Sequence, residues 1–188
     1  MNPKNLSQPI FEEWKRVAES GPQERLPKEE QTRCIIYSAL RSEFRTVSAE
    51  RGYGSIDEGS RPECDLWAHS EGQPQVFIEI KHAWSAPRLN NKPSEQMASW
   101  MTDLAKMEGL PPDTDRFFIL VGFLDADPLL VTMPESRSVL SGIRGLHPSK
   151  LVFQDSSTFR WRKEGITHIA MWAWHWPAGT ALDSLAKV

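Results

Sequence analysis

Two acidic residues and a lysine have types and spacing that could do chemistry together: Asp65, Glu79 and Lys81. Asp65 belongs to segment 63–69, and the other two belong to segment 75–81. Both segments alternate between apolar and polar residues, as strands with one buried face do. Because a short turn containing glycine separates them, the two segments are predicted to pair as an antiparallel hairpin.

The position of the turn predicts which residues of this hairpin face each other. With the turn centred on Gly72, Asp65 lies opposite Glu79. Directly opposed residues of antiparallel strands have Cβ atoms about 4.5–5.5 Å apart. Lys81 would project from the same face as Glu79, about 7 Å further along the strand. Two carboxylates that close repel each other unless a cation lies between them.

A hard divalent ion would suit such a face. Mg²⁺ binds one or two carboxylates and keeps several waters, so we expect Asp65 and Glu79 to hold Mg²⁺ or Mn²⁺, with the backbone carbonyl of Ile80 as a third ligand. The ion can lower the pKa of a bound water and offset charge on a phosphoryl oxygen. Lys81 could orient that water or stabilise that charge. The alternative is a cross-strand salt-bridge cluster, which is common on sheets.

The spacing of these residues resembles a known motif. Asp65, followed after thirteen residues by Glu79-Ile80-Lys81, is similar to the motif of the PD-(D/E)XK nuclease superfamily. The resemblance spans about residues 27–124 and implies a restriction-endonuclease-like α/β core: helix, three strands, helix and strand, in a mixed sheet flanked by helices. It also implies hydrolysis of phosphodiester bonds. The proline and aspartate of the family name are not adjacent here, because Pro62-Glu63-Cys64 precede Asp65.

The resemblance extends to the two helices of that core. Members of the superfamily often carry an acidic residue on the first helix; Glu29 fits that position best, and Glu30 is the second choice. Gln96 and Trp100 resemble the Gln-x-x-x-Tyr motif of the RecB-like nucleases, with tryptophan in place of tyrosine, and Lys106 resembles a basic position of some members. The alternative for Gln96 and Lys106 is that they are solvated helix residues.

The expected site therefore has two groups of residues. The expected catalytic residues are Asp65, Glu79, Lys81, Gln96 and Glu29. The expected substrate contacts are Lys106, Trp100 and Trp84, the last of which lies three residues after Lys81. A second Glu-x-Lys copy, Glu13-Trp14-Lys15, lies in a helical pattern without an acid on a preceding strand, so we reject it as a chance match.

The rest of the chain supplies the elements that would position this site. The predicted elements, in order, are helix 8–20, a helix beginning at Pro27, strands 45–50, 63–69 and 75–81, helix 94–108 and strand 116–124. The last of these is a continuous apolar run, which is typical of a strand buried on both faces. We expect a mixed sheet with helices on its faces.

Residues 135–188 are predicted to form a β-rich C-terminal extension. The patterns indicate a short helix at 135–143 and three strands, at 150–154, 158–162 and 166–176. Trp172, Trp174 and Trp176 recur at every second position and so share one face of the last strand. Bases can stack on such a row. We favour packing against a helix or an oligomer contact, because aromatic stripes more often form core.

Composition excludes several classes of protein. The chain has 188 residues, of which 39% are hydrophobic and 25% are charged, which argues against a disordered or fibrous protein. A net charge of -3 argues against a strongly basic DNA-coating protein. No apolar run approaches the ~18 residues of a membrane span, and the N-terminus lacks the pattern of a signal peptide. We therefore expect one cytoplasmic domain over residues 1–188, without a membrane partner.

The expected function is divalent-metal-dependent hydrolysis of nucleic acid, with DNA favoured over RNA. One alternative is a binding or adaptor protein that keeps the same fold but is catalytically silent. Another is a protein-interaction factor, such as an immunity or assembly protein, that uses the tryptophan-rich C-terminal sheet. A homodimer or a protein partner remains open in each case.

Overall fold

The computed structural model describes residues 1–20, 28–52, 63–84, 93–108, 110–125, 146, 150–161 and 165–180. Its helices are α1 (Lys4–Ser20), α2 (Glu29–Leu40) and α3 (Pro93–Glu108). Its strands are β1 (Thr46–Gly52), β2 (Glu63–His69), β3 (Gln75–Trp84), β4 (Thr114–Leu124), β5 (Leu151–Trp161) and β6 (Ile166–Trp176). The order up to β4 follows the predicted order. The helix predicted at 135–143 lies outside the described residues.

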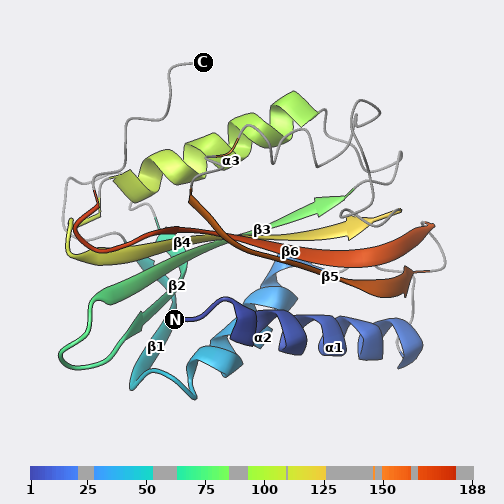
Figure 1. Ribbon diagram of the computed structural model, residues 1–188, viewed down its shortest axis with the longest axis horizontal. Helices are drawn as coiled ribbons and strands as arrows, with labels where there is room; N and C mark the ends of the chain where they lie inside the picture. The colour runs from blue at the N-terminus through green and yellow to red at the C-terminus, as the bar shows by residue number, and fades with distance from the viewer. Residues whose placement is uncertain are drawn as a thin grey trace.

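The six strands form one mixed sheet in the order β1-β2-β3-β4-β6-β5. β3 and β4 are parallel, and every other neighbouring pair is antiparallel. Helix α3 lies in the connection between the two parallel strands, on the opposite side of the sheet from α1 and α2 (Figure 1). The predicted α/β class with a mixed sheet is therefore confirmed.

The β2–β3 hairpin has the predicted turn but a shorter ladder than predicted. Leu66 pairs with Ile78 and Trp67 with Phe77, which is the register expected for a turn centred on Gly72. Gly72 has a φ of 76°, a left-handed conformation that glycine adopts without strain. The paired region reaches no further than Leu66 and Ile78, so the predicted pairing of the next residues, Asp65 with Glu79, is absent from it.

The described residues of the C-terminal part form two strands, β5 and β6, where three were predicted. β5 is one strand of 11 residues that covers both 150–154 and 158–162 in the prediction, and its pairing with β6 has two irregularities. The residues between the two predicted segments, 155–157, are polar. They fit within a strand because β5 is the last strand in the sheet order, where polar side chains can reach water.

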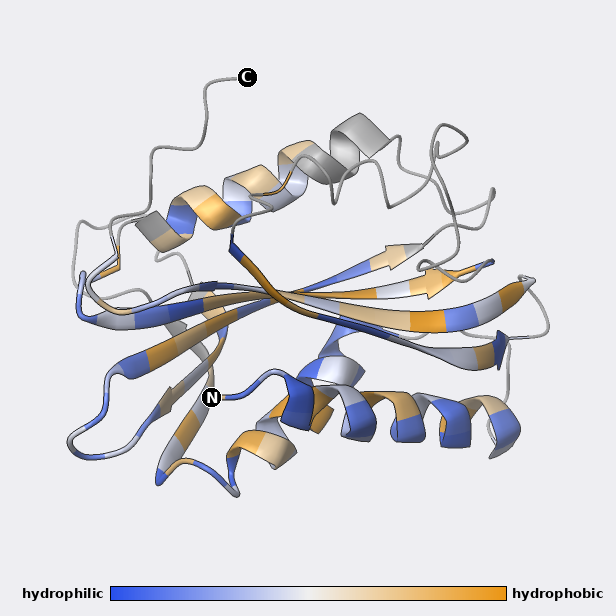
Figure 2. Ribbon diagram, viewed as in Figure 1, coloured by the Kyte–Doolittle hydropathy of each residue, from blue (hydrophilic) through white to orange (hydrophobic). Residues whose placement is uncertain are grey.

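Apolar residues bury both faces of the sheet (Figure 2). α1 and α2 pack on one face, with Trp14 and Ile36 in that core. α3 packs on the other face, where Trp172, Trp174 and Trp176 join its core and are at most 4% exposed. The predicted packing role of the tryptophan row is confirmed. No helix in the described part of the chain combines the length and apolar character needed to cross a membrane.

Candidate active site

The ammonium of Lys81 is the meeting point of three elements. Lys81 Nζ lies 3.1 Å from Glu79 Oε1 on the same strand and 3.1 Å from Asp103 Oδ2 on α3. It also lies 3.9 Å from Glu29 Oε1, at the start of α2. The side chain of Lys81 is 18% exposed and that of Glu79 is 5% exposed, so their ion pair is largely shielded from water.

Two carboxylates hold the edge of β3 beyond its ladder with β2. Asp65 Oδ2 accepts the backbone N–H of Ile80 at 2.7 Å. Glu29 Oε2 accepts the backbone N–H of His82 at 3.2 Å. Alternate residues of a strand direct their N–H groups toward the same neighbour, so these side chains take the place that a longer β2 ladder would have. This arrangement fixes both acids against the backbone of the strand that carries Lys81.

Two further cations surround this cluster. Arg33 Nη1 lies 3.7 Å from Asp65 Oδ1. Lys106 forms an ion pair with the second carboxylate oxygen of Asp103, the one that does not face Lys81. Glu29, Asp65, Glu79 and Asp103 therefore meet Lys81, Arg33 and Lys106. Four carboxylates against three cations leave the cluster with an excess of negative charge when all of them are ionised.

Burial and the neighbouring charges together shift the pKa values of three groups in the cluster. Burial raises the pKa of Glu79 to about 7, the nearby charge of Asp65 adds to the rise, and Lys81 opposes it. Burial also raises the pKa of Glu29, and Lys81 again opposes the rise. Burial lowers the pKa of Lys81, but the carboxylates around it together outweigh burial, so its pKa is raised overall. Lys81 is therefore charged at neutral pH while Glu79 is partly protonated.

The other side of β3 is held by a buried hydroxyl. Thr32 is fully buried on α2, and its Oγ1 accepts the indole N–H of Trp14 at 3.1 Å. The same oxygen is hydrogen-bonded to His82 Nε2 at 2.7 Å. His82 thus directs its ring toward α1 and α2, away from Lys81. These bonds tie the end of β3 to both helices on that face.

The structure brings together most of the predicted site residues. Asp65, Glu79, Lys81 and Glu29 lie in one cluster, and Lys106 joins it through Asp103. Ile80, whose carbonyl was the predicted third ligand, contacts the cluster through its backbone N–H, which is bonded to Asp65.

The remaining predicted residues contribute no described contact to the cluster. Trp100 is 3% exposed and packs in the core under α3, so it presents no surface to a substrate. Gln96 lies in the first turns of α3 and Trp84 at the end of β3, but their side chains lie outside the described part of the structure.

Asp103 and Arg33 are site residues that the sequence analysis missed. Asp103 falls within the apolar stripe of α3, three residues after Trp100 and one before Leu104. A charged residue in a buried stripe needs a partner, and this signal was readable in the sequence. Arg33 lies four residues after Glu29, so it shares the helix face of Glu29.

The oxygen ligands of this cluster suit a hard divalent cation. Asp65 and Glu79 interact strongly enough for the charge of Asp65 to raise the pKa of Glu79. An added cation would relieve that repulsion, and Mg²⁺ requires no more than one or two carboxylates. Within the described residues, no three histidine, cysteine or carboxylate side chains form a group that could hold a metal ion. Asp65 and Glu79 are the two carboxylates whose mutual repulsion a cation would relieve.

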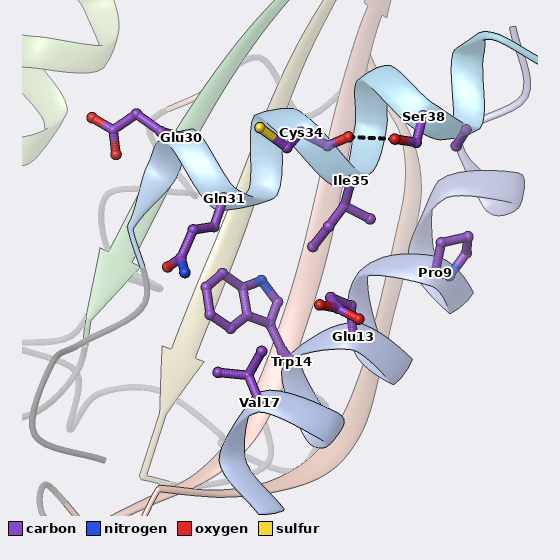
Figure 3. A pocket seen from close by; sticks show the side chains of 10 residues that line it. Pro9, Glu13, Trp14, Val17, Glu30, Gln31, Cys34, Ile35 and Ser38 are labelled. Carbon is purple, nitrogen blue, oxygen red and sulfur yellow. Dashed lines mark hydrogen bonds between the residues drawn. The ribbon is translucent and has the colours of Figure 1, made fainter. Parts of the chain in front are cut away.

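An open groove of about 660 Å³ lies elsewhere, between α1 and α2 (Figure 3). Its wall includes Trp14 and Val17 from α1 and Cys34 and Ile35 from α2. The groove does not contain the carboxylates that surround Lys81. Trp14, in its wall, donates its indole N–H to Thr32, on the side of β3 that faces away from Lys81.

Comparison of the chain with protein-family models, with curated proteins and with solved structures found no match.

Proposed function

We propose that this chain is a divalent-metal-dependent nuclease of the PD-(D/E)XK superfamily that hydrolyses phosphodiester bonds in DNA. The observation that carries the proposal is the convergence of Asp65, Glu79 and Lys81 at the point where β2 and β3 cease to pair. Glu29 reaches the same point from the first helix of the core, as the resemblance implied.

The topology supports a restriction-endonuclease-like core. α2 is followed by three antiparallel strands, β1 to β3, then by α3 and by β4, which pairs parallel to β3. This is the order of helix, three strands, helix and strand that the superfamily implies. On this proposal β6 and β5 are an extension that continues the sheet beyond β4.

Each site residue has a role in the proposed reaction. Asp65 and Glu79 would hold Mg²⁺ or Mn²⁺, with the carbonyl of Ile80 as a further ligand. The bound ion would lower the pKa of a coordinated water and offset charge on a phosphoryl oxygen. Lys81 supplies a charged ammonium beside Glu79, placed to stabilise negative charge that develops on the scissile phosphate. Glu29 links α2 to β3 by accepting the backbone N–H of His82.

A plasmid-cleavage assay tests this function. Purified chain is incubated with supercoiled DNA in Mg²⁺, in Mn²⁺ and in EDTA, and nicked or linear product is measured. We expect metal-dependent cleavage that falls about 100-fold or more in Asp65→Asn, Glu79→Gln and Lys81→Met, as for loss of a group that stabilises charge in the transition state. Lys15→Met, in the rejected Glu-x-Lys copy on α1, is the matched control and should cleave like the wild type.

Two results would contradict the proposed nuclease activity. One is cleavage that survives in EDTA, and the other is equal cleavage by the wild type and Lys81→Met, which would indicate a contaminating enzyme. RNA and single-stranded DNA substrates, tested beside the plasmid, separate the proposed DNA specificity from a broader one.

A catalytically silent binding protein is the second candidate. This candidate is favoured because each carboxylate of the site already forms an ion pair with a lysine or arginine of the chain. Calorimetric titration with Mn²⁺ distinguishes the two, because the nuclease requires cation binding that Asp65→Asn weakens. An absence of binding would favour the silent protein.

A further inference from the structure

The two carboxylates nearest to Lys81 Nζ come from different elements. Glu79 precedes it by two residues on β3, whereas Asp103 reaches it from α3, and both lie 3.1 Å from Nζ. A stronger interaction with one carboxylate draws the ammonium away from the other. Since Glu79 is a ligand for a divalent cation in the proposed function, any group that draws Lys81 away from Glu79 favours that cation.

Asp103 is itself shared between two lysines. One carboxylate oxygen faces Lys81 and the other is paired with Lys106. The Asp103 side chain is 9% exposed, whereas that of Lys106 is 39% exposed. An ion pair with one exposed partner is screened by water and contributes little, so Lys106 moderates the pull of Asp103 on Lys81 without cancelling it.

Packing holds Asp103 in place independently of Lys81. Trp100, Leu104 and Met107 are each at most 3% exposed and fix the inner face of α3 against the sheet. Asp103 lies on that face, among these residues. This packing fixes the backbone of Asp103, and its short side chain has little reach, while Lys81 has a long side chain that can move between the two acids.

The geometry points to a competition that controls the metal site: Asp103 draws the Lys81 ammonium off Glu79 and so makes Glu79 available to a divalent cation, and Lys106 weakens that effect. Asp103 is thus a positioning residue that acts through Lys81. The inference rests on the proposed function, because it assumes that Glu79 binds the cation.

A double-mutant cycle on cation affinity tests the competition without any measurement of activity. The dissociation constant of Mn²⁺ is measured by calorimetry for the wild type, Asp103→Asn, Lys81→Met and the double variant. Loss of one negative charge weakens cation binding directly in both backgrounds, so the informative quantity is the difference between them. We expect Asp103→Asn to weaken binding about threefold to tenfold when Lys81 is present and less than about twofold in the Lys81→Met background.

Lys106→Met is the second variant, and it should strengthen Mn²⁺ binding when Lys81 is present. Its exposed side chain makes it the safer variant for folding, and circular dichroism verifies the fold of every variant. Asp113→Asn, at an exposed turn, and Lys15→Met are the matched controls for the two changes in charge, and neither should alter the dissociation constant.

The outcomes separate this inference from the proposed function. If wild-type protein binds Mn²⁺ and Asp103→Asn weakens binding equally in both Lys81 backgrounds, the competition is refuted while the metal site stands. If Asp103→Asn fails to fold, an unchanged or weaker affinity in Lys106→Met refutes it. If the wild type binds no Mn²⁺, the proposed function fails and this inference fails with it.

Discussion

The carboxylate of Asp65 accepts the backbone N–H of Ile80 at 2.7 Å, on the edge of β3 that β2 has ceased to pair. The side chain of Asp65 thus supplies the hydrogen-bond acceptor that a backbone carbonyl of a paired strand would otherwise supply. Glu79 directly precedes Ile80 on β3, so the bond also brings Asp65 close to Glu79. One interaction therefore ends the hairpin ladder and brings together the two acids of the candidate site.

Replacement of Asp65 tests the structural part of that role. Ile80 is fully buried, and a buried N–H without an acceptor costs about 1–3 kcal/mol. We expect Asp65→Ala to lower the free energy of unfolding by about that amount, and Asp65→Asn, whose amide oxygen can still accept, to lower it by less. Urea denaturation followed by tryptophan fluorescence measures both. Equal stability of the alanine and asparagine variants would show that the bond contributes nothing.

The pH dependence of stability should report the burial of Glu79. Its pKa rises from 4.5 to about 7 on folding, so the folded state binds more protons than the unfolded chain between those values. Stability therefore falls as pH rises through this window. Between pH 5.5 and 8, wild-type protein should lose about 2 kcal/mol of unfolding free energy relative to Glu79→Gln.

Comparison with Glu79→Gln isolates the charge of Glu79 together with its effect on the carboxylates coupled to it. The carboxylates outside this cluster titrate alike in both proteins and cancel in the difference. Denaturant unfolding at a series of pH values gives the two curves. Parallel curves across pH 5–8 would mean that Glu79 titrates in the folded state as it does in the unfolded chain.

Thr32 should be more important for stability than an ordinary helix threonine. Its hydroxyl accepts from Trp14 and is bonded to His82. Thr32→Val keeps the shape of the side chain but removes those bonds, so we expect a loss of about 1–3 kcal/mol of unfolding free energy.

Two other variants are controls for that measurement. Thr32→Ser keeps the hydroxyl and should lose less. Thr102→Val, on the exposed side of α3, should change stability by no more than about 0.5 kcal/mol. A loss in Thr102→Val as large as that in Thr32→Val would remove the special role of the buried hydroxyl.

Local patterns were sufficient to predict most of the elements. Alternating residues predicted β2 over 63–69, and the structure has Glu63–His69. The glycine in the turn predicted the pairing of Trp67 with Phe77. These features depend on neighbours along the chain, which one sequence contains. The same reasoning predicted two strands, at 150–154 and 158–162, where the structure has the single strand β5 at the end of the sheet order.

The sequence by itself determined the type and spacing of Asp65, Glu79 and Lys81, from which a metal-dependent site with Glu29 was predicted. Only the tertiary structure decided how they meet. The 2.7 Å bond to Ile80, rather than a cross-strand pair, positions Asp65. Asp103 reaches Lys81 because the burial of α3 sets the rotation of that helix against the sheet. Contacts between distant segments depend on packing and have no local signature, which is why Asp103 could not be identified from the sequence as a partner of Lys81.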